Sequence, residues 1–249
     1  MLKNDLYLEK ALMNAAGTLG FAPDPKGPVD LSQLGAFVTN PVSRGARTPA
    51  KGKRFSRYPG GFVLHSGLPN PGLNAVIRQN RKRWARATLP VIVHLLALDP
   101  NSLARMVERL EGIEGVMAVE VGLPPEVDPA SAYDFAQAAI GELPAIVRLP
   151  LEQAEELSEA VVDGGASAVS LGAPRGKLEG INGRMYGPGV FPLALRAVEN
   201  LAGCGVPLIG AGGVYQQRDV EAMLAAGASA VQVDAVLWRG SGDDFAEAE

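Results

Sequence analysis

One stretch near the carboxyl end of the chain, residues 206–235 (VPLIGAGGVYQQRDVEAMLAAGASAVQVDA), constrains the fold more than any other part of the sequence. A short apolar strand, Val206–Ile209, runs into a turn that holds Gly212 and Gly213. A helical segment then leads to a second apolar strand, Ala230–Val233. Small residues at the carboxyl end of a strand let backbone N–H groups approach a ligand, and the following helix presents its positive end there. The stretch therefore predicts a β–α–β unit that can hold an anion.

The position of this unit in the chain favours a barrel. In (β/α)8 barrels, the loops after the last two strands often hold a phosphate group. Asp234 opposes such a cradle, because it follows the second strand directly and places a carboxylate where further backbone donors are expected. A carboxylate within about 5 Å of a dianion costs on the order of kcal/mol, even at an effective dielectric constant near 20. The orientation of the Asp234 side chain decides whether the backbone donors stay available.

Apolar, β-branched runs recur along the whole chain and alternate with helical patterns. Continuous apolar runs are typical of strands buried on both faces of a parallel sheet. Eight such runs are present: Leu12–Ala15, Ala36–Thr39, Pro90–Leu95, Val116–Val121, Ala145–Leu149, Ala168–Leu171, Pro207–Gly210 and Ala230–Val233. Helices are predicted at Pro100–Ile113, Leu151–Val162, Gly189–Leu201 and Tyr215–Ala225. Together they predict an α/β protein, a single (β/α)8 (TIM) barrel domain over residues 1–249.

A repeated hexapeptide supports the barrel. GASAVS at 165–170 recurs as GASAVQ at 227–232, and each copy ends a predicted helix and opens a predicted strand. The copies lie two β/α units apart, as strands six and eight of a barrel would. Two long Pro/Gly-rich inserts, at 41–72 and 172–189, follow the second and sixth strands. Loops of this length are uncommon unless functional, and we expect both at the carboxyl end of the barrel, where active sites are built.

The composition argues against several classes of protein. No apolar run approaches the roughly 20 residues that a membrane span needs, so no membrane association is expected. The net charge of -4 gives no reason to expect nucleic-acid binding, and the one basic run, at 78–87, is interpreted as the solvated face of a helix. Cys204 is the only cysteine, so an intrachain disulfide is impossible and a cytoplasmic location is expected.

At this point the chain resembles the dihydroorotate dehydrogenases, FMN-binding barrels of pyrimidine biosynthesis. MNAAGTLG at 13–20 is similar to the first-strand motif beside the flavin, and GAFVTN at 35–40 is similar to the second strand. PGGFVLHSGLPNPGLNAV at 59–76 resembles the long loop over the substrate. VIVHL, AVEVGLPP, AIVRL, the Gly187–Pro188 turn and IGAGGV…GASAVQV follow in the family's order. The resemblance therefore covers almost the whole chain.

The resemblance implies a flavin site with altered polar groups. The implied cofactor-binding residues are Ala15, Ala16, Gly17, Asn40, His94, Arg148, Gly187, Gly212, Gly213, Asp234 and Ala235. Asn40 stands where the family has a lysine, and His94 where it has an asparagine. Arg148 replaces a lysine that supports the electron-rich end of the flavin. It keeps the charge, but a guanidinium is a planar fork whereas an ammonium is a point donor. Asp234 replaces a Gly or Ala whose backbone N–H meets the phosphate.

The residues that carry the family's reaction have changed as well. In the family, a Cys or Ser on the loop after the fourth strand takes the substrate proton as general base while a hydride goes to FMN. The resemblance puts Pro125 at that position, and proline cannot accept a proton, so the catalytic residue is unassigned. Glu126 is adjacent but is typical of a surface-loop carboxylate. The implied substrate pocket consists of His65, Ser66, Gly67, Leu68, Asn70 and Gly122.

The two histidines, His65 and His94, allow several interpretations. In one, both face a ligand in a rebuilt site and Arg148 supplies positive charge, since histidine can donate, accept or titrate near neutral pH. In another, they fill a vacated pocket and bond to the backbone. A metal site from His65, His94 and Glu120 is a third, unspecific interpretation, and no metal is predicted. Tyr186 is the better candidate for covering a ring.

Two functions follow from this mixture. The first is an FMN-binding oxidoreductase-like barrel with altered or lost dihydroorotate oxidation, in which Arg175, Lys177 and Arg184 of the late insert could compensate for Asp234. The second is a non-catalytic barrel without flavin that acts as a binding or subunit-interaction protein. Both predict a small-molecule ligand, and the resemblance implies a homodimer or a partner subunit.

Overall fold

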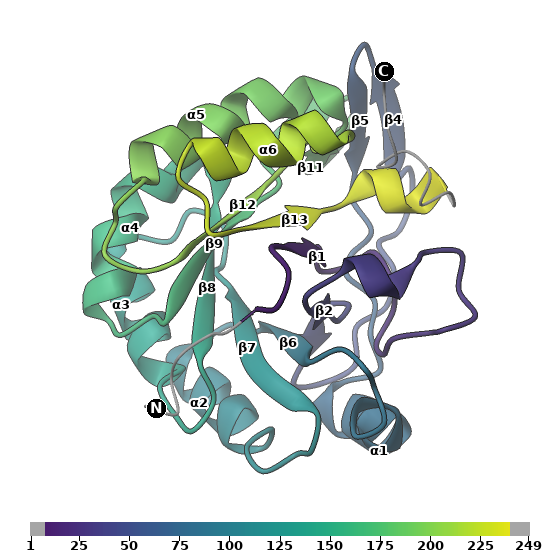
Figure 1. Ribbon diagram of the computed structural model, residues 1–249, viewed down its shortest axis with the longest axis vertical. Coiled ribbons are helices and arrows are strands. Elements are labelled where there is room, and N and C mark those ends of the chain that lie inside the picture. Colours follow the sequence, from purple (N-terminus) through teal and green to yellow (C-terminus); the bar gives the residue numbers. More distant parts are fainter. Residues whose placement is uncertain (1–7, 240–249) are drawn as a thin grey trace.

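The computed structural model describes residues 8–239 and, within them, a barrel of eight parallel strands ringed by helices (Figure 1). The barrel strands are β1 (Leu12–Asn14), β2 (Phe37–Val38), β6 (Val91–Leu96), β7 (Val116–Gly122), β8 (Ala145–Pro150), β9 (Ala168–Gly172), β12 (Leu208–Ala211) and β13 (Ala230–Val233). From β2 to β13, each strand pairs with the next in this order. β13 pairs with β1, and a bridge between Met13 and Ala36 joins β1 to β2. The predicted barrel and its eight strands are confirmed.

Apolar side chains fill the barrel and cover its outer face. The interior cluster consists of Met13, Ala36, Val38, Ile92, Ala118, Ile146, Ala168, Ile209 and Ala230. A larger apolar cluster lies between the outer face of the strands and the helices. Burial on both faces explains why each strand is a continuous apolar run in the sequence. Because the barrel interior is otherwise apolar, the polar side chains near the carboxyl ends of its strands are candidates for a functional site.

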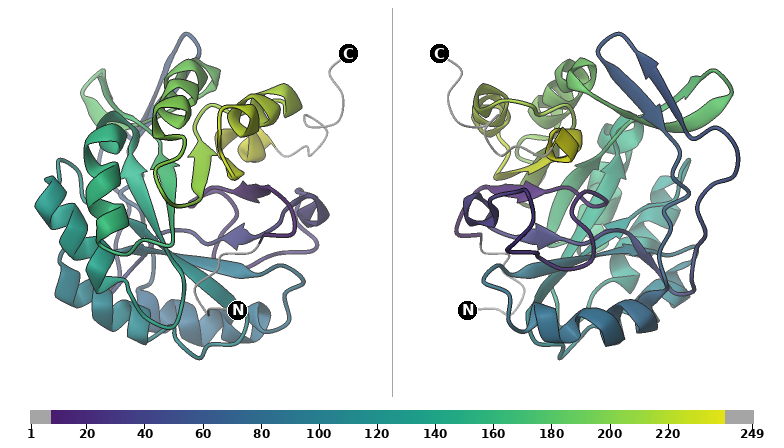
Figure 2. Two further views of the ribbon diagram at one scale, coloured as in Figure 1. Left: turned by 60° about the vertical axis from the view of Figure 1, so that its left-hand side comes forward. Right: turned by 90° about the vertical axis from the view of Figure 1, so that its right-hand side faces the viewer.

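Within residues 8–239, six α-helices cover the strands from outside (Figure 2). They are α1 (Leu73–Trp84), α2 (Pro100–Glu108), α3 (Pro129–Ala138), α4 (Ala154–Asp163), α5 (Phe191–Leu201) and α6 (Gln217–Ala225). Asp99 and Asp128 cap α2 and α3, because each carboxylate accepts a backbone N–H of the first turn and a proline follows. The basic run lies on α1 with its Arg and Lys side chains exposed, as predicted.

The two long inserts meet in a second sheet at the carboxyl ends of the barrel strands. Insert 41–72 forms β3 (Val42–Ser43), β4 (Phe55–Tyr58) and β5 (Gly61–Leu64), and insert 172–189 contains β10 (Arg175–Leu178) and β11 (Ile181–Tyr186). β3 pairs with β6, whereas β10, β11, β5 and β4 form an antiparallel sheet in that order. The right-hand view of Figure 2 shows the two hairpins rising together above the barrel. The predicted position of both inserts is confirmed.

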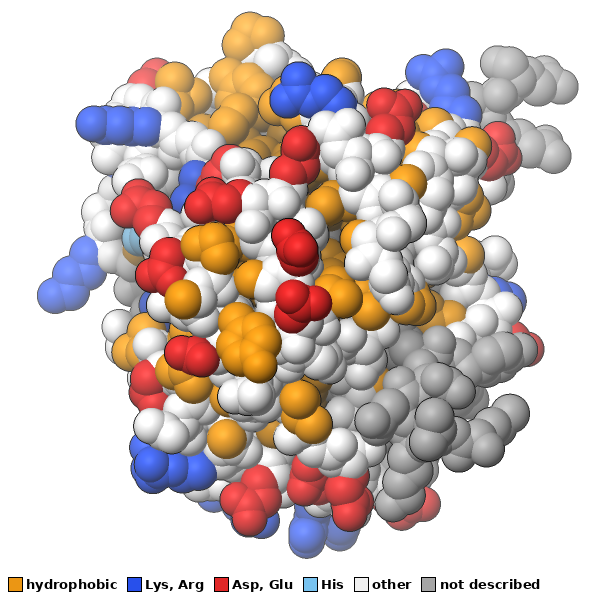
Figure 3. Space-filling model, turned by 90° about the vertical axis from the view of Figure 1, so that its left-hand side faces the viewer, with side chains coloured by type: hydrophobic (Ala, Val, Ile, Leu, Met, Phe, Trp, Pro, Cys, Tyr) orange, Lys and Arg blue, Asp and Glu red, His pale blue; other side chains and the backbone are white. Residues whose placement is uncertain are grey.

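The end of the described chain lies against this second sheet. After β13 the backbone forms a short 3₁₀ helix, η4 (Ala235–Arg239), in which Trp238 contacts the rings of Phe62 and Tyr186. The hexapeptide repeat opens β9 and β13, the sixth and eighth barrel strands, as predicted. Among the described residues, no helix is long and apolar enough to cross a membrane. Acidic side chains spread across the middle of the helical face in Figure 3, while basic ones lie toward its edges.

Candidate active site at the barrel mouth

Five polar side chains meet inside the barrel near the carboxyl ends of its strands. Glu120 of β7 is fully buried and lies at their centre. Its Oε2 is 2.6 Å from His94 Nδ1, and its Oε1 accepts hydrogen bonds of 2.7 Å from Ser170 Oγ and from Gln232 Nε2. Arg148 Nη1 lies 3.9 Å from Glu120 Oε2. Four strands, β6, β8, β9 and β13, thus each direct one polar group at the same carboxylate of β7.

The network sets the charge of its members. Burial alone would raise the pKa of Glu120, but the hydrogen bond from His94 and the charge of Arg148 lower this pKa to about 2. Burial lowers the pKa of His94, and the nearby Arg148 and Arg184 lower it further, against the opposing effect of the Glu120 carboxylate. Burial thus disfavours the charged imidazole, whereas the Glu120 carboxylate favours it. An ionised carboxylate only accepts hydrogen bonds, so Nδ1 is the donor of this contact.

Gly122 and His94 share one space at the end of β7. A Cβ placed on Gly122 would lie 2.9 Å from His94 Nε2, a contact so short that the ring would have to move. Both residues stand where the resemblance implies asparagines, so the larger ring at 94 occupies room that the glycine leaves. Gly122 lines a cavity, and His94 is buried behind it, whereas His65 is exposed in the cavity wall. The two histidines therefore do not form one ligand-facing pair.

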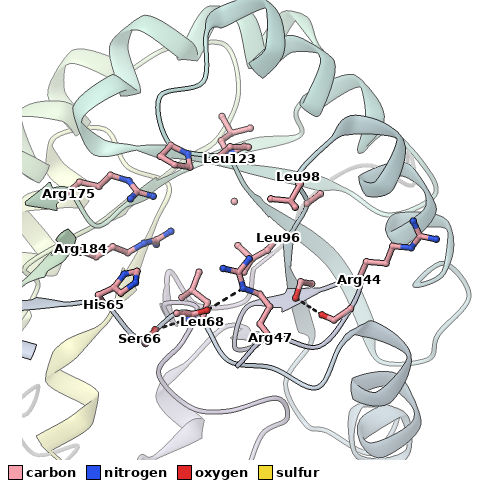
Figure 4. A pocket seen from close by; sticks show the side chains of 18 of the residues that line it. Arg44, Arg47, His65, Ser66, Leu68, Leu96, Leu98, Leu123, Arg175 and Arg184 are labelled. Carbon is pink, nitrogen blue, oxygen red and sulfur yellow. Dashed lines mark hydrogen bonds between the residues drawn. The ribbon is translucent and has the colours of Figure 1, made fainter. Parts of the chain in front are cut away.

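A cavity of about 570 Å³ opens beside the barrel mouth, between insert 41–72 and the loops that follow β6 and β7 (Figure 4). Part of its wall is apolar, from Leu68, Leu96, Leu98, Leu123, Pro124 and Pro125. The basic residues of its lining are Arg44, Arg47, His65, Arg175 and Arg184. Asp99 is the one acidic residue of the lining, and its carboxylate already accepts the Ser102 N–H at the start of α2. The cavity combines apolar surface with a strong excess of positive charge, within the size range of small-molecule sites.

Two side chains of β11 lie at the barrel mouth and line the cavity. Arg184 and Tyr186 are two residues apart on one strand and so project from the same face. Both side chains are half-buried and line the 570 Å³ cavity, and burial lowers the pKa of Arg184 and raises the pKa of Tyr186. The Tyr186 ring stacks on Phe62 at 5.5 Å and 24° and meets Trp238 edge-on at 5.5 Å. Its phenol interacts electrostatically with Arg148 of β8 and with Asp234 after β13, so it lies between these strand ends.

The glycine turns predicted to form an anion cradle are present, and the chain itself uses part of this region. Gly213, at φ +70°, packs so closely on the start of α5 that a Cβ would lie 2.4 Å from Phe191 N. Gly187 and Ala235 line a second cavity of about 800 Å³ next to this turn. Asp234 is only 5% exposed, and its carboxylate accepts the backbone N–H of Ala235. The Asp234 carboxylate therefore takes the N–H of Ala235, one of the residues that the resemblance assigns to the cofactor.

The residues as placed do not fit FMN. The flavin ring would need the barrel mouth and the phosphate would need the glycine cradle. Phe62 lines the second cavity and stacks on Tyr186, which lines the first, so this aromatic pair separates the two spaces. Burial also raises the pKa of Asp234, which means that its ionised form is already poorly solvated before any phosphate approaches. FMN binding would require Tyr186 and Arg184 to leave the mouth.

Other predicted site residues divide between the cavity wall and the loops that support it. Of the implied substrate pocket, the residues that line the 570 Å³ cavity are His65, Ser66, Gly67, Leu68 and Gly122. Asn70 is instead 6% exposed and bonds to Ser43 and to the Gly72 N–H, so it shapes the loop. Asn40 Oδ1 accepts the Gly20 N–H at 3.1 Å and fixes the segment after Ala15, Ala16 and Gly17.

The implied base position holds no proton acceptor. Pro125 lines the cavity, and Glu126 is exposed on the same loop outside the lining. Within residues 8–239, no group of three or more His, Cys, Asp or Glu side chains could hold a metal ion. The metal interpretation of His65, His94 and Glu120 is therefore wrong, since His94 bonds directly to Glu120 and His65 belongs to the cavity wall.

Sequence reasoning missed two members of the buried network, Ser170 and Gln232. Both are the last residue of the repeated hexapeptide, in GASAVS and in GASAVQ. Because the copies open equivalent strands, their last residues occupy equivalent positions in β9 and β13, and both point to Glu120. The two copies of the repeat differ only at this last position, and that difference could have pointed to Ser170 and Gln232 as site residues. Arg47 was also missed, because nothing in the Pro/Gly-rich insert distinguishes it from its neighbours.

Comparison with known proteins identifies the family of this barrel. A family model described as dihydroorotate dehydrogenase matches residues 3–143, and one described as nitronate monooxygenase matches residues 133–239. The catalytic subunit of dihydroorotate dehydrogenase B (NAD(+)) from Pelobacter propionicus is 33% identical, over 92% of this chain and 84% of its own length. Dihydroorotate dehydrogenase A (fumarate) from Lacticaseibacillus paracasei is 31% identical, over 91% of this chain and 87% of its own length.

A solved structure agrees with the fold. The crystal structure of the Eimeria tenella enzyme DHODH in complex with ferulenol superposes with a TM-score of 0.79, over 96% of this chain and 79% of that one, at 14% sequence identity. This likeness supports the barrel fold, whereas the sequence matches show the family. The chain belongs to the dihydroorotate dehydrogenase family.

Proposed function

We propose that this member of the family is a small-molecule-binding barrel that has lost dihydroorotate oxidation and holds no FMN. The observation that carries the proposal is the position of Tyr186. Its ring is stacked on Phe62 and packed against Trp238, and its phenol lies in the electrostatic reach of Asp234. These contacts support the proposal that the chain's own side chains take the volume that a flavin ring would need.

The loss of the proton acceptor supports the same proposal. Pro125 stands at the implied base position, and its neighbour Glu126 is exposed outside the cavity lining. The buried carboxylate that remains, Glu120, accepts hydrogen bonds from Ser170 and Gln232 and contacts His94 Nδ1. A carboxylate with a pKa of about 2 is a poor base near neutral pH. The network is better suited to holding the barrel mouth rigid than to moving a proton.

FMN binding with altered chemistry is the second candidate. The glycines at 187, 212 and 213 support it, because all three have positive φ and keep the backbone open to a phosphate. Arg148 supports it as well, since it keeps a positive charge at the end of β8. This candidate requires Tyr186 and Arg184 to swing out of the mouth when FMN enters.

Visible absorbance separates the two candidates. We expect purified protein to lack a flavin absorbance band, and added FMN to leave its melting temperature unchanged. Dihydroorotate with FMN and an artificial electron acceptor should give no turnover above the rate without protein. A catalytic subunit of dihydroorotate dehydrogenase B serves as the positive control in the same assay. A flavin that copurifies in stoichiometric amount would overturn the first candidate in favour of the second.

A partner subunit or a homodimer stays a prediction for this chain. Its support is that several relatives carry the name catalytic subunit. Phe55, Leu98 and Trp238 are large apolar side chains exposed around the mouth, at 43%, 86% and 43%. Light scattering during size-exclusion chromatography measures the mass directly. We expect more than one copy per particle, and a mass of 26.0 kDa would contradict a homodimer.

A further inference from the structure

Two arginines lie directly opposite each other in the hairpin of the late insert. Arg175 of β10 and Arg184 of β11 are register partners in an antiparallel pair, and both line the 570 Å³ cavity. Like charges at such positions destabilise a hairpin. Arg175 also lowers the pKa of Arg184, which burial lowers already. The pairing of Arg175 with Arg184 therefore costs stability in the absence of a ligand. An anion bound by both guanidinium groups would offset this cost.

A third guanidinium behind the hairpin supports this. Arg148 is 6% exposed, and its Nε is buried without a hydrogen-bond partner. It lines a small void of about 20 Å³ together with Arg175 and Arg184, next to the larger cavity. Glu120 is 3.9 Å from Nη1 and is already bonded to other groups. Glu152 is the one acid among the residues that line the void, against three arginines, and Asp234 also interacts electrostatically with Arg148. A buried cation with an unmet donor is costly, so this wall is short of negative charge.

The other insert contributes a separate cation. Arg47 of insert 41–72 donates from Nε to the Gly67 carbonyl at 3.2 Å, which fixes the direction of its guanidinium. In Figure 4 this guanidinium points into the cavity, toward the side from which Arg184 enters, whereas that of Arg44 points away. Leu96, Leu98 and Leu123 also line the cavity, and Figure 4 shows Leu123 and Leu98 on other sides of it than Arg175 and Arg184. The cavity therefore presents cations from two separate inserts together with apolar side chains.

We propose that this cavity binds a small molecule with two anionic groups, carboxylate or phosphate, one held by Arg175 and Arg184 and the other by Arg47, with an apolar body between them. The arrangement differs from a site for a single carboxylate because its cations come from two separate inserts, 41–72 and 172–189. Asp99, the one acid of the lining, is engaged as a helix cap, and the four arginines of the lining outnumber it. The proposal rests on the proposed function, since Arg184 stays in this position only while the mouth holds no flavin.

Calorimetric titration at constant ionic strength tests the proposal. Probes with two anionic groups, called two-ended here, are succinate, glutarate, adipate and 3-phosphoglycerate. Probes with one anionic group, called one-ended, are butyrate, orotate and inorganic phosphate. We expect at least one two-ended probe to bind about tenfold or more tightly than every one-ended probe, because two charge-assisted contacts are formed instead of one. Carboxylate and phosphate ends are distinguished by comparing the dicarboxylates with 3-phosphoglycerate.

Variants assign the two ends. Arg47→Ala and Arg184→Ala should each reduce the affinity for the best two-ended probe to the one-ended level. Arg78→Ala is the matched control, since Arg78 is exposed on α1 outside the cavity lining, and it should leave binding unchanged. Circular dichroism verifies folding. Should Arg184→Ala fail to fold, Arg184→Lys keeps the charge but loses the planar fork, and we expect it to weaken binding in part.

Several outcomes would overturn the proposal. The first is equal affinity for one-ended and two-ended probes, and the second is no saturable binding of any probe. The third is an affinity that falls in Arg184→Ala but not in Arg47→Ala, and the fourth is an equal fall of affinity in Arg78→Ala. An FMN titration of the same samples keeps the two claims apart. Stoichiometric FMN binding would contradict the proposed function, whereas failure of the anion probes in a flavin-free protein would contradict only this inference.

Discussion

Glu120 Oε2 and His94 Nδ1 lie 2.6 Å apart at the centre of the barrel mouth, and both side chains are at most 1% exposed. The pair ties β6 to β7 where the two strands end, and Ser170 and Gln232 extend it to β9 and β13. Strand ends that diverge at the mouth of a barrel are thereby held in one geometry. The walls of the neighbouring cavity start from these same strand ends.

Glu120→Gln should destabilise the barrel by about 3 kcal/mol, because the amide cannot accept all of the hydrogen bonds and leaves Arg148 as an uncompensated buried charge. For a chain of this size, the melting temperature should fall by about 6–12 °C at pH 7. The folded pKa of Glu120 is about 2, below its ordinary value of 4.5. Its stabilisation is therefore complete above about pH 4.5 and is lost as the pH falls toward 2.

Calorimetric melting of the two proteins between pH 3 and pH 7 measures this effect. Glu108→Gln on α2 is the control, since Glu108 is exposed on the outer helices, and it should melt like the unaltered protein. A wild-type advantage that stays constant as the pH falls through this range would contradict the assignment of Glu120 as an ionised buried acid.

Asp234→Asn should stabilise the folded protein at neutral pH. Burial raises the pKa of Asp234, so the folded state holds its proton more firmly than the unfolded chain. The free energy of unfolding of the wild type therefore rises as the pH falls through the folded pKa, and at pH 7 the ionised carboxylate reduces stability. Asparagine keeps an oxygen for the Ala235 N–H and removes the charge. We expect a melting temperature a few degrees higher at pH 7, with the gap closing in acid.

Asp134→Asn provides the comparison for that experiment, because Asp134 is exposed on α3. Thermal denaturation of Asp234→Asn, Asp134→Asn and wild type at several pH values is the measurement. Equal melting temperatures for Asp234→Asn and wild type at pH 7 would show that the buried carboxylate carries no electrostatic penalty.

Gly122→Ala should destabilise the protein by about 1–3 kcal/mol, because its Cβ would fall 2.9 Å from His94 Nε2 and force the ring away from Glu120. In a His94→Asn background the shorter side chain leaves room, so the same alanine should cost at least about 1 kcal/mol less. Urea denaturation of the wild type, both single variants and the double variant gives this coupling energy. Additive effects would mean that the two positions are independent.

The barrel was predictable because its strands are buried on both faces. Short runs rich in β-branched residues, such as Pro90–Leu95 and Val116–Val121, favour strands buried on both faces, and the repeated hexapeptide placed strands six and eight correctly. The inserts were predictable in position, because a loop after a barrel strand must lie at the carboxyl end. Their internal structure was not, since the pairing of β11 with β5 joins segments more than 100 residues apart.

The site was predictable only in part. The family resemblance implied His65 and Gly122 as pocket residues, and both line the cavity. The position of Tyr186 could not be read from the sequence, because it depends on the stack with Phe62 and on Trp238, which come from distant parts of the chain. The burial of Asp234 likewise depends on its rotamer and on what covers it. Successive side chains of a strand point to opposite faces, so the sequence of β11 would have shown that Arg184 and Tyr186 share a face. It would not have shown that this face lies at the barrel mouth.

The central claim is that the chain's own side chains fill the barrel mouth, and quenching of FMN fluorescence tests it most directly. FMN is titrated into the wild type and into a variant with Arg184→Ala, Tyr186→Ala and Asp234→Gly, which clears the mouth and frees the Ala235 N–H. We expect no saturable quenching by the wild type and stoichiometric quenching by the variant. Stoichiometric quenching by the wild type would contradict the account, as would a folded variant that binds FMN no better than the wild type.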